Sequence, residues 1–149
     1  MMNEVTLEIA RKALAGSERW ARDIAGFPCS IAVVDKAGVP VAVHRMDGAA
    51  MLTVEIAIGK AWSAVAMQLP TLLLARNTDP RNLGTKLGEH GLGMGGMAKG
   101  RLVTIAGGIP ITGDEGDIIG AIGCSGVPQG LGDVSDTAVS QAGISALYD

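Results

Sequence analysis

The residues of this 149-residue chain best suited to chemistry lie at positions 44–48, which read HRMDG. We expect this segment to end a strand, which would hold the Arg45 guanidinium in place and require an anionic partner for it. Asp47 can supply that anion, or Glu55 can pair with Lys60, and in either case the cations make internal ion pairs. Alternatively, Arg45 and Lys60 form a clamp for the carboxylate of a small acid.

Several other residues would complete a catalytic site around such a clamp. His44 is either a packed or surface histidine or, like Asp47, a group that moves a proton or positions water. Gly107 and Gly108 leave bare backbone, so that a ligand can approach their amide groups closely. Ser125 is either a turn residue at a strand end or a contact to substrate. The sequence thus predicts catalytic residues His44 and Asp47 and substrate-binding residues Arg45, Lys60, Gly107, Gly108 and Ser125.

Three other sequence features argue against dinucleotide binding, metal ligation by histidine and a disulfide. Residues 91–96 read GLGMGG and match G-x-G-x-x-G, but no strand precedes them and no helix follows, so we interpret them as a glycine loop and not as a dinucleotide site. His44 and His90 have no second histidine or cysteine at ligand spacing, so no metal site is expected. Cys29 and Cys124 lie in apolar runs and are interpreted as small hydrophobic residues without a disulfide.

Composition narrows the class of protein further. Apolar residues make up 48% and charged residues 18% of the chain, which indicates one globular domain over residues 1–149. The net charge of -3, without a basic cluster, argues against nucleic-acid binding. No secretion signal or membrane span is evident, so a cytoplasmic location is predicted. The low charge predicts that other copies cover apolar surface, as in a homo-oligomer.

Hydrophobic periodicity predicts a fold of hairpins and helices. Helices are expected at residues 6–24, 52–67, 71–76 and 133–147, strands at 29–34, 40–46, 101–111 and 118–125, and a loop at 77–100. Because the order contains hairpins and no strand-helix-strand alternation, the sheet should be mostly antiparallel with helices packed on it.

Four sequence blocks together resemble the GlcG/HbpS family, which includes the carboxy-terminal domain of PduO-type proteins. They read VAVHRMDGA at 41–49, EIAIGKAW at 55–62, GGIPI at 107–111 and GAIGCSG at 120–126 followed by Asp133. The resemblance implies an α/β domain of the α+β type, with a central antiparallel five-stranded sheet flanked by helices. It also implies assembly into dimers or octamers.

The resemblance leaves three functions open. The leading hypothesis is an enzyme without a prosthetic group that performs hydrolytic or proton-transfer chemistry on an unsaturated oxo- or hydroxy-dicarboxylate from aromatic catabolism. The alternative is a haem-binding, haem-degrading or haem-sensing protein, in which Arg45 pairs with a propionate. A non-catalytic assembly protein is the third. Haem-binding members use a histidine in or near the first helix, but residues 6–24 contain none, which leaves threonine, methionine or His44 as ligands.

Overall fold

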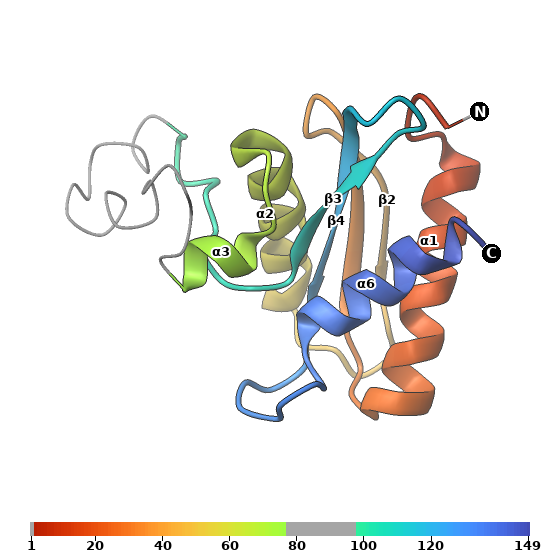
Figure 1. Ribbon diagram of the computed structural model, residues 1–149. Coiled ribbons are helices and arrows are strands. Elements are labelled where there is room, and N and C mark those ends of the chain that lie inside the picture. Colours follow the sequence, from red (N-terminus) through yellow and green to blue (C-terminus); the bar gives the residue numbers. More distant parts are fainter. Residues whose placement is uncertain (1, 77–97) are drawn as a thin grey trace.

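Four antiparallel strands form one sheet in the computed structural model, which describes residues 2–76 and 98–149 (Figure 1). Their order across the sheet is β2-β1-β4-β3. The strands are β1 Ser30–Asp35, β2 Pro40–Arg45, β3 Gly108–Thr112 and β4 Ile118–Ser125. The prediction of a mainly antiparallel sheet is confirmed, whereas the expectation of five strands is wrong for the part of the chain described.

Helices cover both faces of this sheet and give the domain three layers (Figure 1). One layer holds α1 and α6, and the other holds α2 with the short α3. The helices are α1 Leu7–Trp20, α2 Leu52–Met67, α3 Thr71–Ala75 and α6 Asp136–Ala146, and a π-helical turn η1 Ala21–Ala25 extends α1. Thr6 caps α1 by accepting a hydrogen bond from the amide of Ile9, and Ser135 caps α6 in the same way.

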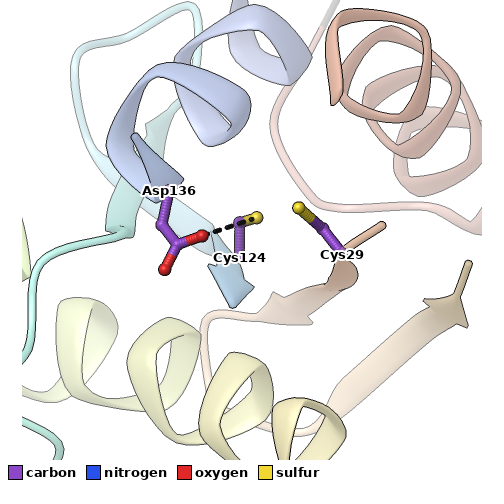
Figure 2. A group of neighbouring side chains, drawn as sticks. All are labelled: Cys29, Cys124 and Asp136. Atoms are coloured by element: carbon purple, nitrogen blue, oxygen red, sulfur yellow. Dashed lines mark hydrogen bonds between the residues drawn. The ribbon is translucent and has the colours of Figure 1, made fainter. Parts of the chain in front are cut away.

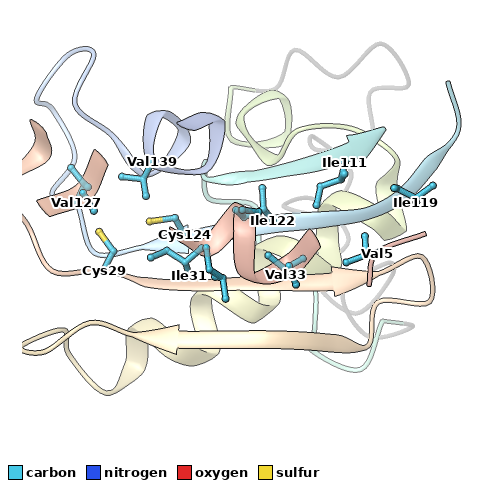
Figure 3. Close-up of a cluster of buried hydrophobic side chains, with 14 residues drawn as sticks. Val5, Cys29, Ile31, Val33, Ile111, Ile119, Ile122, Cys124, Val127 and Val139 are labelled. Carbon is cyan, nitrogen blue, oxygen red and sulfur yellow. The ribbon is translucent and has the colours of Figure 1, made fainter. Parts of the chain in front are cut away.

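The main core fills the space between the sheet and the α1/α6 layer (Figure 3). Because side chains alternate along a strand, Ile31 and Val33 of β1 belong to this core while Val34 packs on the α2 side. Neighbouring β4 contributes Ile122 and Cys124 to the same core. Both faces of β1 and β4 are therefore buried, which explains their nearly continuous apolar sequences.

Small residues let α2 lie almost directly on the sheet. A Cβ atom added at Gly123 would stand 2.2 Å from the carbonyl oxygen of Ala57, and one added at Gly108 would stand 2.2 Å from that of Lys60. Contacts this short cannot exist, so only glycine fits at these two positions. The second core cluster, between α2 and the strands, is accordingly built of Val34, Ala61, Ala64 and Ala121.

Two predicted elements differ from the observed ones. Residues 101–107 are not strand, because the chain there follows α2 instead: the Val103 amide donates to Ser63 Oγ, and Arg101 stacks on Trp62. The last helix starts at Asp136 rather than at residue 133. His90 and the glycine-rich residues 91–96 lie outside the described residues. Within residues 2–76 and 98–149, no helix is long and apolar enough to span a membrane.

Candidate functional site

A surface groove lies where the end of β2 meets α1 and η1. It has a volume of about 490 Å³, within the usual range for small-molecule sites. Its lining brings together three residues of the predicted site with three that the sequence did not suggest: His44, Arg45 and Asp47, with Glu18, Arg22 and Met46. Glu18 and Arg22 stand four residues apart in a helical sequence. This spacing places them on the same helix face, so the sequence could have indicated that they lie together.

The His44 imidazole is oriented by a carboxylate from the first helix. Its Nδ1 lies 2.5 Å from Glu18 Oε1, and about half of the imidazole side chain is exposed, 51%. An ionised Glu18 can only accept a hydrogen bond, so it favours the tautomer with the proton on Nδ1. The Nε2 lone pair then remains available to a ligand. Although His44 belongs to a strand, its side chain lies beside the first helix.

The guanidinium of Arg45 is available in the same groove. Among the described residues it makes no ion pair, so the predicted pairing with Asp47 is not formed. Arg22 is exposed and pairs only with its neighbour Asp23, at 2.9 Å between Nε and Oδ1. Exposed pairs of this kind are weak, so both arginines can turn toward an anion in the groove.

Lys60 lies elsewhere, buried between the two helical layers. Its side chain is 1% exposed, and its Nζ donates to Asp136 Oδ2 and to the carbonyl oxygen of Cys124, each at 2.9 Å. The structure therefore pairs Lys60 with Asp136 and not with Glu55. Because Lys60 does not line the groove, the two cations of the predicted clamp are not brought together.

The predicted glycines surround Lys60 rather than the groove. The Gly108 amide donates to Thr71 Oγ1 at 2.9 Å, and the Gly107 carbonyl accepts from Ser140 Oγ at 2.7 Å. A Cβ at Gly107 would stand 3.0 Å from Lys60 Nζ, so its absence makes room for the ammonium. Ser125 pairs with Ser30 at the end of β4, and its contact to substrate stays a prediction.

A second hollow, of about 470 Å³, lies over the exposed side of α2. Its wall includes Trp62, Ile56 and Val103, and Arg101 Cζ lies 5.1 Å from the centre of the Trp62 ring. Trp62 and Arg101 are distant in sequence, so no local pattern indicated their contact. Arg101 gives this hollow a cation, and among the described residues that line it there is no histidine, cysteine or methionine.

The two cysteines share a buried environment near Asp136. The pKa of Cys29 is lowered, chiefly by its interaction with the neighbouring Cys124 side chain, although burial opposes this effect. The pKa of Cys124 is raised well above its usual value, chiefly because burial penalises the thiolate. Of the two, Cys29 is therefore the more readily ionised thiol.

Comparison with known proteins places this chain in a family. The family model described as haem degrading protein HbpS-like matches residues 5–145, so the chain belongs to the HbpS-like family. It is also 33% identical over 115 residues to the corrinoid adenosyltransferase PduO of Citrobacter freundii. That match covers 76% of this chain but 32% of PduO, so the chain spans about a third of that relative's length.

Solved structures give the same result. A double mutant of HbpS from Streptomyces reticuli is 30% identical, with a TM-score of 0.78 over 99% of this chain and 89% of that one. The complex of PduOC with haem is 27% identical, with a TM-score of 0.76 over 96% and 94% of the two chains. The resemblance seen in the sequence blocks is therefore confirmed.

Proposed function

We propose that this protein binds haem in the groove formed by α1, η1 and the end of β2, with His44 Nε2 as the axial ligand to iron. The observation that carries the proposal is the half-exposed His44 imidazole, held at Nδ1 by Glu18. Histidines that ligate metals usually donate their other ring nitrogen to such a carboxylate, which fixes the ring and raises its basicity. The haem-related descriptions of the family and of the PduOC complex support this function over the predicted hydrolytic enzyme.

The donor set of the groove matches the chemistry of haem. One neutral nitrogen ligand and two guanidinium groups correspond to one iron and two propionate carboxylates. The groove offers His44 for the iron, and Arg45 and Arg22 for the carboxylates. Met46 is less suited as a ligand, because its Sδ accepts a hydrogen bond from the Cys29 amide at 3.4 Å.

In this proposal the chain binds and orients the ligand. Glu18 would keep the Nδ1 proton of His44 in place, while Arg45 would pair with a propionate carboxylate. Bound haem would supply a redox-active iron. The homo-oligomer, from dimer to octamer, stays a prediction that light scattering after size-exclusion chromatography tests.

A titration of the haem-free protein with haemin tests the proposal. We expect a Soret band that saturates at one equivalent per chain, and its loss or strong weakening in His44→Ala. His90→Ala is the matched control, because the chain has two histidines. Arg101→Ala tests the hollow beside Trp62 as the alternative location. Both control variants should bind haemin like the parent protein.

Two results would overturn the proposal. A Soret change that never saturates would reject haem binding itself. Saturable binding that survives His44→Ala but is lost in His90→Ala or Arg101→Ala would reject the groove as its location.

A further inference from the structure

Three side chains of types that can ligate metal ions converge away from the groove (Figure 2). Cys29 precedes β1, Cys124 belongs to β4 and Asp136 begins α6. One ligand atom from each lies within 4.8 Å of the other two, and both cysteines are fully buried. Figure 2 shows the two sulfur atoms turned toward each other, with the carboxylate beside Cys124.

The Asp136 carboxylate is held from several directions. Its Oδ2 accepts from Lys60 Nζ at 2.9 Å, while its Oδ1 accepts from the Val127 amide at 2.9 Å and from the Cys124 thiol at 3.5 Å. One oxygen therefore faces the ammonium and the other faces the thiols. A carboxylate so oriented by outer partners is the usual arrangement around a bound metal.

We propose that Cys29, Cys124 and Asp136 form a binding site for a thiophilic divalent cation of the Zn²⁺ type. Tetrahedral zinc places a sulfur and an oxygen ligand about 3.5 Å apart and two sulfurs about 3.8 Å apart, given Zn–S near 2.3 Å and Zn–O near 2.0 Å. The Cys124–Asp136 separation of 3.5 Å already matches the first spacing. Three protein ligands leave a fourth position for water or another ligand.

Charge balance favours the same assignment. Two neutral thiols, one carboxylate and the Lys60 ammonium sum to zero. When a divalent cation replaces the two thiol protons, two thiolates, one carboxylate, the cation and the ammonium again sum to zero. The buried cluster can therefore exchange two protons for one metal ion without leaving an uncompensated charge in the interior.

A third hollow lies on the Asp136 side of the proposed metal site. It has a volume of about 160 Å³, and Asp136 and Val127 both contribute to its wall. The Asp136 side chain is 14% exposed, whereas both cysteines are fully buried. An ion can therefore approach from the Asp136 side and meet the carboxylate before it reaches the sulfurs.

Titration of the reduced, haem-free protein with Co²⁺ tests this site. Co²⁺ replaces zinc and reports its ligands through sulfur-to-metal charge-transfer and tetrahedral d–d absorption. We expect both signals to saturate at one equivalent per chain and Zn²⁺ to abolish them by competition. Cys29→Ala and Cys124→Ala should each lose about half of the charge-transfer intensity, while the matched control His44→Ala should keep all of it.

Asp136→Asn alone would leave the Lys60 ammonium buried without its anion, so the carboxylate is tested in the double variant Lys60→Met/Asp136→Asn. This variant should keep both thiols but bind Co²⁺ more weakly. Circular dichroism verifies that each variant is folded. Absence of a saturable signal in the folded parent protein, or an unchanged signal in the Cys29→Ala/Cys124→Ala variant, would overturn the site. Neither result depends on haem binding.

Discussion

The Nζ atom of Lys60 and the Oδ2 atom of Asp136 lie 2.9 Å apart, and this ion pair joins the two helical layers across the end of the sheet. Lys60 extends from α2, while Asp136 is the first residue of α6. The negative charge also suits the amino-terminal end of α6, where unpaired amide groups create a positive potential. The pair therefore fixes the position of one helix relative to the other.

Removing one partner of this pair should destabilise the protein strongly. Lys60→Met leaves Asp136 charged and mostly buried without a cation, and broken buried pairs cost about 3–5 kcal/mol. Urea unfolding followed by circular dichroism should show a lower midpoint. The double variant Lys60→Met/Asp136→Asn should recover much of the loss, because no uncompensated charge remains. A single variant as stable as the parent would contradict the assigned role of the pair.

Adding one methyl group beneath α2 should also destabilise the fold. In Gly123→Ala the new Cβ would meet the Ala57 carbonyl, so α2 must move away from the sheet, at a cost of roughly 1–3 kcal/mol or more. Gly26→Ala is the matched comparison, because Gly26 has a φ of 74° but open space around it. In that variant the free energy of unfolding should fall only by the cost of placing alanine at a positive φ, about 1 kcal/mol. Thermal unfolding should give a lower melting temperature for Gly123→Ala than for Gly26→Ala. The opposite order would contradict the close packing of α2 on the sheet.

If His44 ligates haem iron, the Glu18 carboxylate that contacts its Nδ1 should affect the affinity of the protein for haemin. Glu18→Gln keeps the size of the side chain but weakens the hydrogen bond to Nδ1, and outer partners of this kind are worth about 10–100-fold in metal affinity. Haemin titrations monitored at the Soret band measure the change. Glu8→Gln, on the same helix but outside the groove, should leave affinity unchanged. Equal affinities for the parent and Glu18→Gln would argue against the proposed role of Glu18.

Arg45 should make the groove distinguish haemin from its dimethyl ester. Arg45→Ala removes a partner for a propionate, so it should weaken binding of haemin, whose carboxylates are ionised. The ester lacks those charges and should bind the parent and the variant similarly. Added salt should weaken haemin binding more in the parent than in the variant. A variant that loses affinity equally for both compounds would indicate a packing role for Arg45.

Local sequence patterns predicted α2 and β4 with their full residue ranges, because helical periodicity at 52–67 and a dense apolar run at 118–125 are strong signals. They failed at residues 101–107, where apolar residues pack along α2 through contacts such as Val103 with Ser63. A tertiary contact determined the structure there, and no spacing within the segment reports it.

The site was predictable only where its residues are close in sequence. His44, Arg45 and Asp47 line one groove because they are neighbours at a strand end. The partners Glu18 of His44 and Asp136 of Lys60 are far away in the chain, so spacing alone did not find them. The same holds for Cys29 and Cys124, which strand pairing brings together.

The ion pair between Lys60 and Asp136 also constrains when the domain can fold during synthesis. Until Asp136 has left the ribosome, a docked α2 would hold a buried ammonium with only the Cys124 carbonyl as acceptor. The partly synthesised chain should therefore keep α2 away from the sheet. Completion of the core should therefore wait until α6 has been synthesised.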